Sequence, residues 1–251
     1  MYGIIGGTGL TQLSSLDDVR REVIRTPYGE PSGPLTCGHI NGVQAVFLAR
    51  HGYGHTIPPH QVNYRANLWA LKEKGVTEVV SVASVGGIRA DLGPGRIVVP
   101  DQLIDYTWGR ASTYFEGEKP VTHIDFTQPY TGVLRERILA AAAAAGQQAT
   151  DGGVYAATQG PRLETAAEIN RLERDGADLV GMTGMPEAVL ARELALSYAT
   201  IAVVVNHAAG RADSREGIHM ETIEASLRES MGRVRLIIEK LVVEPASGIS
   251  T

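Results

Sequence analysis

Short apolar runs that end at glycine or polar residues recur along the chain. Several of these runs are rich in Val and Ile, and such runs are typical of strands buried in a sheet. The pair Asn41-Gly42 between two of the runs indicates a two-residue hairpin turn. We therefore expect strands over residues 2–5, 35–40, 43–49, 76–85, 96–100, 154–158, 179–183 and 199–205.

Segments with apolar residues at helical spacing lie between these runs and predict helices. The segment 63–74 stops at a glycine, as does the alanine-rich segment 134–145. A long helix is expected over residues 214–243. The polar segment 107–127 fits neither pattern and predicts a loop of a length that is often functional. Strands that alternate with helices indicate an α/β protein.

The stretch 177–192 combines a strand, a tight turn and a helix. The helix is expected to begin near Pro186, because proline is tolerated in a first helical turn. Glu187 would then lie at the positive end of the helix dipole. In open α/β sheets ligands bind at the carboxyl ends of strands, so Met182 and Thr183 are candidates to contact an anion. A turn that only packs against its neighbours would explain the same residues.

Composition excludes several classes of function. The chain has 251 residues, of which 43% are hydrophobic, and this length is compatible with one α/β domain. Its formal net charge of −5 and the lack of a Lys/Arg run give no reason to expect nucleic-acid binding. No apolar stretch approaches the ~20 residues of a membrane span. Cys37 is the only cysteine, so no intramolecular disulfide is possible, and we expect a cytoplasmic protein.

Residues that could bind an anion follow several predicted strands. The glycine turn 6–9 would bring backbone N–H groups close to a phosphate at Thr8. The turn lacks the dinucleotide spacing and the acidic residue that should follow, so we favour an inorganic or monoester phosphate over a nicotinamide cofactor. Arg50 and His51 follow another strand, and arginine can bind phosphate through two parallel N–H bonds. Taken singly, each of these turns could lack a ligand.

Five predicted strand ends carry residues of this kind: Thr8, Arg50-His51, Ala83-Ser84, Met182-Thr183 and Asn206. We expect them to meet at the carboxyl edge of one sheet and to form a pocket there. Phosphate ligands would lie at one end of this pocket, and the Asn206 amide would lie at the other.

Several motifs follow one another in a specific order and spacing: the turn 6–9, Ala49-Arg-His-Gly52, His55, Asn63-Tyr64, Gly86, Pro94-Gly95, Gly160-Pro-Arg162, Gly181-Met-Thr183 and Pro186-Glu187. Together they resemble the trimeric purine nucleoside phosphorylase family, with 5′-methylthioadenosine phosphorylase as the nearest branch. The resemblance runs from Tyr2 to about Leu241 and implies one nucleoside phosphorylase domain over residues 1–245, followed by a C-terminal tail over 246–251.

The resemblance also implies a fold, an assembly and a reaction. The expected fold is a single α/β domain with a central mixed β-sheet flanked by helices, and the expected assembly is a homotrimer. The expected reaction is phosphorolysis of a purine nucleoside, with inorganic phosphate as co-substrate and with neither a metal nor an organic cofactor.

Residue roles follow from the same resemblance. The implied phosphate contacts are Thr8, Arg50, His51, Ala83, Ser84 and Thr183. The predicted catalytic residues are His51, Glu164 and Asn206. The predicted substrate-binding residues are Met182, His207, Ala208, Ile218, His123, Glu164 and Asn206. Among these, Met182 would donate its backbone N–H to a ribose hydroxyl, and His123 would reach the active site of a neighbouring subunit.

The residues after the last predicted strand depart from methylthioadenosine phosphorylases, which carry aspartates that contact N7 and N6 of a 6-aminopurine. Asn206-His207-Ala208 takes their place. An amide can donate an N–H to a purine O6 while its oxygen accepts the proton that N7 gains as the base leaves. Glu164, expected in the first turn of a helix, resembles a glutamate of 6-oxopurine phosphorylases that accepts N1–H. Adenine has only a lone pair at N1, which this carboxylate would repel.

By the same resemblance, the 5′ end of the sugar is expected to contact Ile218. Inosine phosphorylases have a histidine at this place, which contacts the 5′-hydroxyl. An apolar residue there suits a methylthio group, whereas a one-residue shift would bring His219 there and favour a hydroxyl. The leading hypothesis is phosphorolysis of 5′-methylthioinosine to hypoxanthine and 5-methylthioribose 1-phosphate. The alternatives are a general inosine/guanosine phosphorylase, a methylthioadenosine phosphorylase and a nucleoside-binding sensor.

Overall fold

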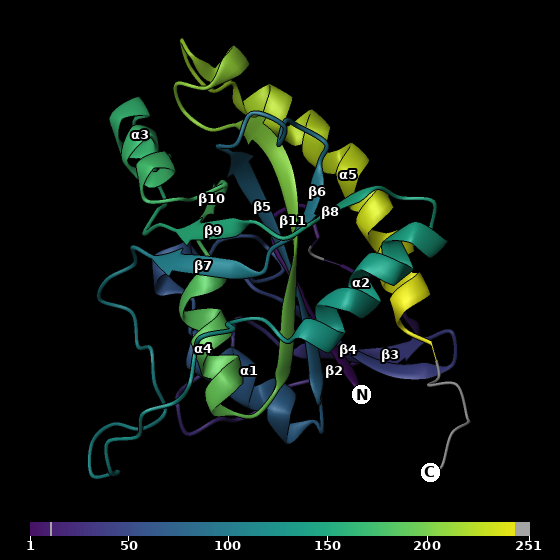
Figure 1. Ribbon diagram of the computed structural model, residues 1–251. Coiled ribbons are helices and arrows are strands. Elements are labelled where there is room, and N and C mark those ends of the chain that lie inside the picture. The colour runs from purple at the N-terminus through teal and green to yellow at the C-terminus, as the bar shows by residue number, and fades with distance from the viewer. Residues whose placement is uncertain (11, 244–251) are drawn as a thin grey trace.

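The computed structural model describes residues 1–10 and 12–243, over which strands and helices alternate (Figure 1). The strands are β1 (Tyr2–Gly6), β2 (Asp17–Glu22), β3 (Leu35–Ile40), β4 (Val43–Ala49), β5 (Glu78–Gly87), β6 (Ile97–Val99), β7 (Gln102–Asp105), β8 (Ala149–Asp151), β9 (Val154–Ala157), β10 (Leu179–Gly181) and β11 (Ser197–His207). The α-helices are α1 (Tyr64–Glu73), α2 (Gly132–Ala144), α3 (Ala166–Arg174), α4 (Gly184–Glu193) and α5 (Met220–Leu241). The short 3₁₀ turns are η1 (Pro59–Gln61) and η2 (Ala212–Ser214).

The described strands form one mixed sheet in the order β2-β3-β4-β1-β5-β10-β9-β7, and β11 pairs with β5 and leads through β6 to β8. β4, β1, β5 and β11 run parallel, so their carboxyl ends face the same edge of the sheet. β10 pairs with β5 in the antiparallel direction at Gly86 and Gly87. The predicted single α/β domain with a mixed central sheet is confirmed.

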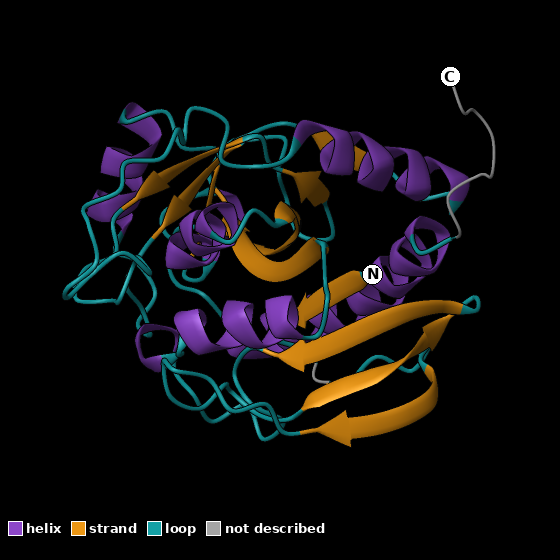
Figure 2. Ribbon diagram, turned by 90° about the horizontal axis from the view of Figure 1, so that it is seen from below, coloured by secondary structure: helices purple, strands orange, loops and turns teal. Residues whose placement is uncertain are grey.

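Apolar side chains cover both faces of the central strands, because successive residues of a strand point to opposite faces. In β1, Ile4 belongs to the cluster that packs against α2 and α5, whereas Ile5 belongs to the cluster that packs against α1 and α4. α3 covers a smaller cluster that includes Val180 of β10. Helices therefore pack on both faces of the central part of the sheet (Figures 1 and 2).

Two local predictions are confirmed. Asn41 and Gly42 have φ angles of 51° and 79°, the positive values that a type I′ turn requires between β3 and β4. α1 begins after Asn63, whose side chain accepts the N–H of Ala66, and the helix ends before Gly75 at a φ of 83°. The hairpin turn and the two ends of α1 are therefore predictable from the residues at those positions alone.

Other elements differ from the predictions. β2 has the exposed sequence Asp-Asp-Val-Arg-Arg-Glu and offers no apolar face for a pattern to reveal. The sequence pattern also does not predict the short strands β7 and β8. α5 begins at Met220 rather than at Ser214, because η2 and a short loop occupy the preceding residues. The predicted tail, 246–251, lies outside the described residues.

Candidate active site

A cavity of about 420 Å³ lies where several strands end. Its walls come from the turns after β1 and β4, from β5, from the ends of β10 and β11, and from the start of α5. The expectation that all these strands reach the site from one edge is correct for β1, β4, β5 and β11 and wrong for β10. Gly86 permits the antiparallel approach of β10, since a Cβ on it would lie 3.3 Å from Val180 Cγ1.

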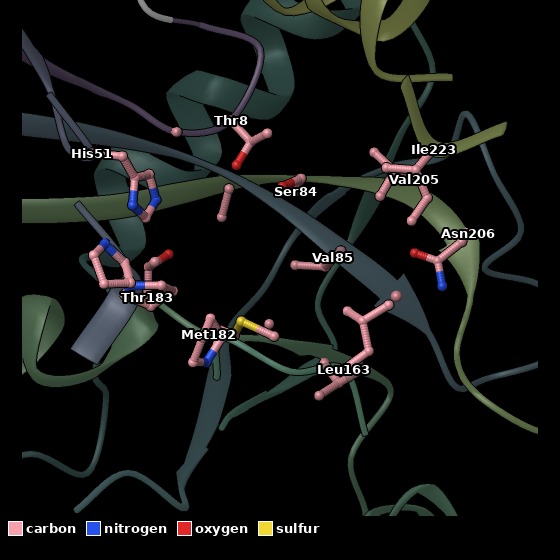
Figure 3. Close-up of a pocket in the computed structure, with 18 of the residues that line it drawn as sticks. Thr8, His51, Ser84, Val85, Leu163, Met182, Thr183, Val205, Asn206 and Ile223 are labelled. Atoms are coloured by element: carbon pink, nitrogen blue, oxygen red, sulfur yellow. The ribbon is translucent and has the colours of Figure 1, made fainter. Parts of the chain in front are cut away.

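Most of the predicted site residues line this cavity: Thr8, Arg50, His51, Ala83, Ser84, Glu164, Met182, Thr183, Asn206, Ala208 and Ile218. Figure 3 shows Thr8, His51, Ser84 and Thr183 toward one end of the cavity and Asn206 at the other. The cavity therefore separates a hydroxyl-rich end from an amide-bearing end, as the sequence predicts.

Arg50 lines the hydroxyl-rich end, but buried partners already engage most of its guanidinium. Its Nε donates to Glu187 Oε2 at 2.6 Å, and its Nη2 donates to Glu187 Oε1 at 2.9 Å. Further bonds reach Ser81 Oγ from Nη2 at 2.7 Å and the Val82 carbonyl from Nη1 at 3.0 Å. The expectation that Arg50 binds phosphate through two parallel N–H bonds is therefore wrong, because Nε and Nη2 already donate to the Glu187 carboxylate. One N–H of Nη1 is left for a ligand.

Glu187 lies in the first turn of α4, as the sequence suggests, and it also neutralises Arg50. The two side chains are 0% and 1% exposed, and Met185 and Pro186 depart from helical geometry just before Glu187. Ser81 Oγ and the Tyr198 hydroxyl donate to the same carboxylate at 2.7 and 2.8 Å. Burial alone lowers the pKa of the Arg50 guanidinium, but the charge and hydrogen bonds of Glu187 outweigh burial and hold that pKa above its usual value.

His51 offers the cavity a neutral ring. Its Nδ1 lies 2.8 Å from the Ile57 carbonyl oxygen, which can only accept, so Nδ1 carries the hydrogen and Nε2 is left as an acceptor. Burial, reinforced by the charge of Arg50, lowers the pKa of His51 to about 4. Hydrogen phosphate carries a P–OH group that can donate to such an acceptor.

We expect His51 to make the free energy of unfolding depend on pH. Its pKa is about 4 in the folded protein against a usual 6.5, so the unfolded chain takes up a proton first as the pH falls. The stabilisation present above pH ~6.5 is thus lost between pH ~6.5 and ~4, by up to about 3 kcal/mol. Denaturant titrations at two pH values in this window should show a smaller loss in His51→Asn than in the wild type.

The control for this measurement is His219→Asn, because His219 is exposed and lies outside the cavity lining. This variant should lose as much stability on acidification as the wild type. An equal loss in the wild type and in His51→Asn would contradict the assignment.

A bulge in β11 turns Asn206 into the cavity. The register with β5 shifts between Val204 and Asn206, so Val205 is the extra residue. Val205 and Asn206 both line the cavity, although successive residues of a regular strand point to opposite faces. Asn206 Nδ2 donates to the His207 carbonyl at 2.6 Å, and its Oδ1 points toward the cavity in Figure 3. The amide therefore presents an acceptor and keeps a second N–H free.

Glu164 lines the cavity but is not in a helix, so the prediction of a first-turn position is wrong. α3 begins one residue after Thr165, and Glu168 is its first-turn acid, which forms a capping box with Thr165. The Thr158 hydroxyl donates to Glu164 Oε1 at 2.6 Å. Because Thr158 directly follows β9, the end of that strand sets the position of the carboxyl group.

Two predicted substrate-binding residues lie outside the lining. His207 Nδ1 lies 2.6 Å from Asp213 Oδ1, and its ring packs beside Gly93 rather than in the cavity. The predicted substrate contact of the His207 side chain is therefore corrected: its backbone carbonyl instead holds the Asn206 amide. His123 is exposed in the long loop and does not line the cavity of its own chain.

Ile218 lines the cavity together with Met220 and Ile223. His219 is the residue that precedes the first turn of α5, and it is not part of the lining. The arrangement favours the Ile218 register and gives this side of the cavity an apolar surface.

Sequence reasoning missed two groups that shape the site. Thr158 holds Glu164, and a hydroxyl residue at the end of the predicted strand 154–158 is the only signal that could have indicated it. Arg110, in the long loop, donates to the carbonyl oxygens of Met182 and Gln159, both at 2.8 Å. Hydrogen bonds from a side chain to distant backbone groups cannot be predicted from a pattern of residue types.

The sequence model of the Phosphorylase superfamily matches residues 1–243, and the chain belongs to this family. It is 55% identical over 243 residues to a protein of Pseudomonas syringae pv. tomato named probable S-methyl-5′-thioinosine phosphorylase, covering 96% of this chain and 98% of that one. It is also 42% identical over 248 residues to the 6-oxopurine nucleoside phosphorylase of Pyrococcus furiosus, covering 96% and 92% of the two chains.

A similar solved structure is methylthioadenosine phosphorylase from Schistosoma mansoni in complex with adenine. The TM-score is 0.92 at 34% sequence identity, and the match covers 96% of this chain and 90% of that chain. The fold is therefore shared with proteins whose names specify different purines, so the base specificity must come from individual site residues.

Over residues 1–10 and 12–243, no helix combines the length and apolar character needed to cross a membrane. The same part of the chain contains no group of three or more His, Cys, Asp or Glu side chains that could hold a metal ion.

Proposed function

We propose that this protein cleaves 5′-methylthioinosine with inorganic phosphate, giving hypoxanthine and 5-methylthioribose 1-phosphate. The observation that carries the proposal is one cavity that both Asn206 and Glu164 line, with the Asn206 amide at one end and the hydroxyl-rich surface near His51 at the other. The similarity to proteins named as S-methyl-5′-thioinosine phosphorylases and 6-oxopurine nucleoside phosphorylases supports the assignment.

Asn206 and Glu164 fit a purine that carries oxygen at carbon six. The free N–H of Asn206 donates to O6, and its Oδ1 accepts a hydrogen bond from the protonated N7. Glu164 accepts N1–H of hypoxanthine, whereas adenine would present a lone pair to the same carboxylate. An unpaired or repelled polar group in a closed site costs about 1–3 kcal/mol, which gives roughly tenfold to a hundredfold preference for the oxopurine.

Phosphate is held beneath the anomeric carbon by Thr8, Ser84 and Thr183, with the remaining N–H of Arg50 and with Nε2 of His51 as acceptor. The bond between C1′ and N9 stretches first, and its electron pair moves to the purine while positive charge develops on the sugar. A phosphate oxygen then bonds to C1′. Overall, hydrogen phosphate loses one proton and the departing purine gains one at N7, so protons and charge balance. Placement and electrostatic stabilisation carry this reaction, without a covalent intermediate.

Ile218 is expected to favour the methylthio group over a 5′-hydroxyl. Truncation in Ile218→Ala removes apolar contact with that group and should lower kcat/KM for methylthioinosine by about tenfold, with a smaller change for inosine. The measurement is the ratio of the two kcat/KM values in each variant. His219→Ala, the matched control, should leave the ratio unchanged. A change in His219→Ala but not in Ile218→Ala would show that His219, not Ile218, contacts the 5′ end of the sugar.

We further propose a cytoplasmic homotrimer that uses inorganic phosphate as co-substrate and requires neither a metal nor an organic cofactor. The long loop supports the assembly, because His123 is exposed and the neighbouring Val121 exposes 82% of its surface. In a trimer this loop would lie against the cavity of the neighbouring subunit. Sedimentation velocity should give the mass of three chains, and a monomer would contradict the proposal.

An ultraviolet assay of base release tests the function. Methylthioinosine, methylthioadenosine, inosine and guanosine are compared with and without phosphate. We expect phosphate-dependent release of hypoxanthine from methylthioinosine with the highest kcat/KM. Similar values for inosine would indicate a general oxopurine phosphorylase, the fastest release of adenine would overturn the base assignment, and binding without release would indicate a sensor.

A further inference from the structure

Arg110 lies in the long loop between β7 and α2, outside the cavity lining, yet it holds the backbone behind two walls of the site. Nη1 donates to the carbonyl oxygens of Met182 at 2.8 Å and Met185 at 2.6 Å. Nη2 donates to the carbonyls of Gln159 at 2.8 Å and Thr158 at 3.3 Å. Nε donates to the side-chain oxygen of Gln159 at 3.2 Å. All five N–H groups of the guanidinium are therefore used.

The partners of Arg110 are neutral. Among the ion pairs of residues 1–10 and 12–243 none includes Arg110, and its guanidinium carbon lies 5.6 Å from the centre of the Tyr64 ring. Charge pairing thus does not explain why a partly buried arginine stands here. The planar fork instead fixes the relative positions of carbonyl groups that belong to two separate turns.

The two turns carry opposite halves of the reaction. The turn after β10 places Met182 and Thr183 in the cavity lining, where the proposed function assigns them to the sugar and to phosphate. The segment after β9 holds Glu164 for the base, through the hydroxyl of Thr158. The turns also meet directly, because a Cβ on Gly160 would collide with Met182 Sδ. Arg110 bonds to the backbone of both segments, beside the Thr158 hydroxyl, which donates to the Gly181 carbonyl at 3.3 Å.

We propose that Arg110 is a positioning residue that sets the distance between the base-binding and the phosphate-binding halves of the site. The proposal rests on the proposed function and deepens it. Cleavage requires the base to be held while phosphate approaches C1′ from the other side, and an error of about 1 Å in such an arrangement lowers a rate by about 100-fold. Each half binds its own ligand without this registration, whereas catalysis needs both halves in place.

The test compares Arg110→Ala and Arg110→Lys with the matched control Arg135→Ala. Arg135 on α2 likewise donates to two carbonyls, of Val99 and Pro100, and to Asp151, but it lies outside the cavity lining. Activity is measured on whichever nucleoside the wild type cleaves fastest, so a wrong substrate assignment does not affect this test. The dissociation constants of the base released from that nucleoside and of inorganic phosphate are measured separately by calorimetry.

We expect Arg110→Ala to lower kcat by about 100-fold, while each dissociation constant changes by less than about tenfold. Arg110→Lys keeps the charge but not the fork, and it should lose at least about tenfold in kcat. Added guanidinium ion should restore part of the lost kcat of Arg110→Ala. It should not raise the kcat of the wild type. Arg135→Ala should lose as much thermal stability as Arg110→Ala but keep kcat within about threefold of the wild type.

Two results would overturn the proposal. One is a kcat of Arg110→Ala within about threefold of the wild type. The other is loss of both ligand affinities together with a fall in Tm well beyond that of Arg135→Ala, which would mean that Arg110 only supports folding.

Discussion

Replacing Asn206 by alanine should lower kcat/KM for methylthioinosine by about 10²–10³-fold, because its bonds to the base strengthen as N7 takes up a proton in the transition state. The variant should fold normally, since the side chain is only partly buried and its one internal bond is to the adjacent His207 carbonyl. Steady-state assays of hypoxanthine release give the value. Because the interaction forms mainly in the transition state, kcat should fall more than KM rises.

The matched control is Asn170→Ala, which removes an exposed amide of α3 that accepts a bond from Arg211 away from the cavity. It should leave kcat/KM unchanged. A change of less than about threefold in Asn206→Ala, equivalent to under 1 kcal/mol of transition-state stabilisation, would show that Asn206 does not contact the base.

The largest effect on stability is expected for Glu187→Gln. The change leaves the fully buried Arg50 without its opposite charge, and breaking a buried pair in this way costs about 3–5 kcal/mol. Urea titration at pH 7 measures the loss. The KM for phosphate should rise as well, because Glu187 also fixes the direction of the one Nη1 hydrogen that Arg50 offers to the cavity.

Glu173→Gln provides the comparison, since Glu173 is 56% exposed and pairs with Arg211 at the surface. Its cost should stay below about 1 kcal/mol. A second variant separates charge from packing: Arg50→Met combined with Glu187→Leu should recover much of the stability while phosphate binding stays weak. Equal and small losses in Glu187→Gln and Glu173→Gln would contradict the buried-pair account.

The sequence predicts those parts of the fold whose signals are local. The hairpin follows from Asn41-Gly42, and the approach of a glycine turn to the hydroxyl-rich end of the cavity follows from residues 6–9. The start of α3 was also readable, because Thr165 and Glu168 form the capping box that the spacing suggests. This capping box predicts Glu168, not Glu164, as the acidic residue in the first turn.

Contacts between distant residues lie beyond such patterns. Arg50 and Glu187 are 137 positions apart, so nothing near either residue indicates that they pair. The exposed strand β2 forms because β3 offers it backbone partners, not because its own residues alternate. The bulge that turns Asn206 into the cavity depends on the register between β11 and β5. Most residues that line the cavity were therefore predictable, but the interactions that hold them were not.

A crystal structure with hypoxanthine and phosphate tests the central claim most directly. The account predicts the base between Asn206 and Glu164, with N7 and O6 within hydrogen-bond distance of the amide and N1 within that distance of the carboxyl group. Hypoxanthine bound in the cavity with those two side chains turned away from its ring would contradict it.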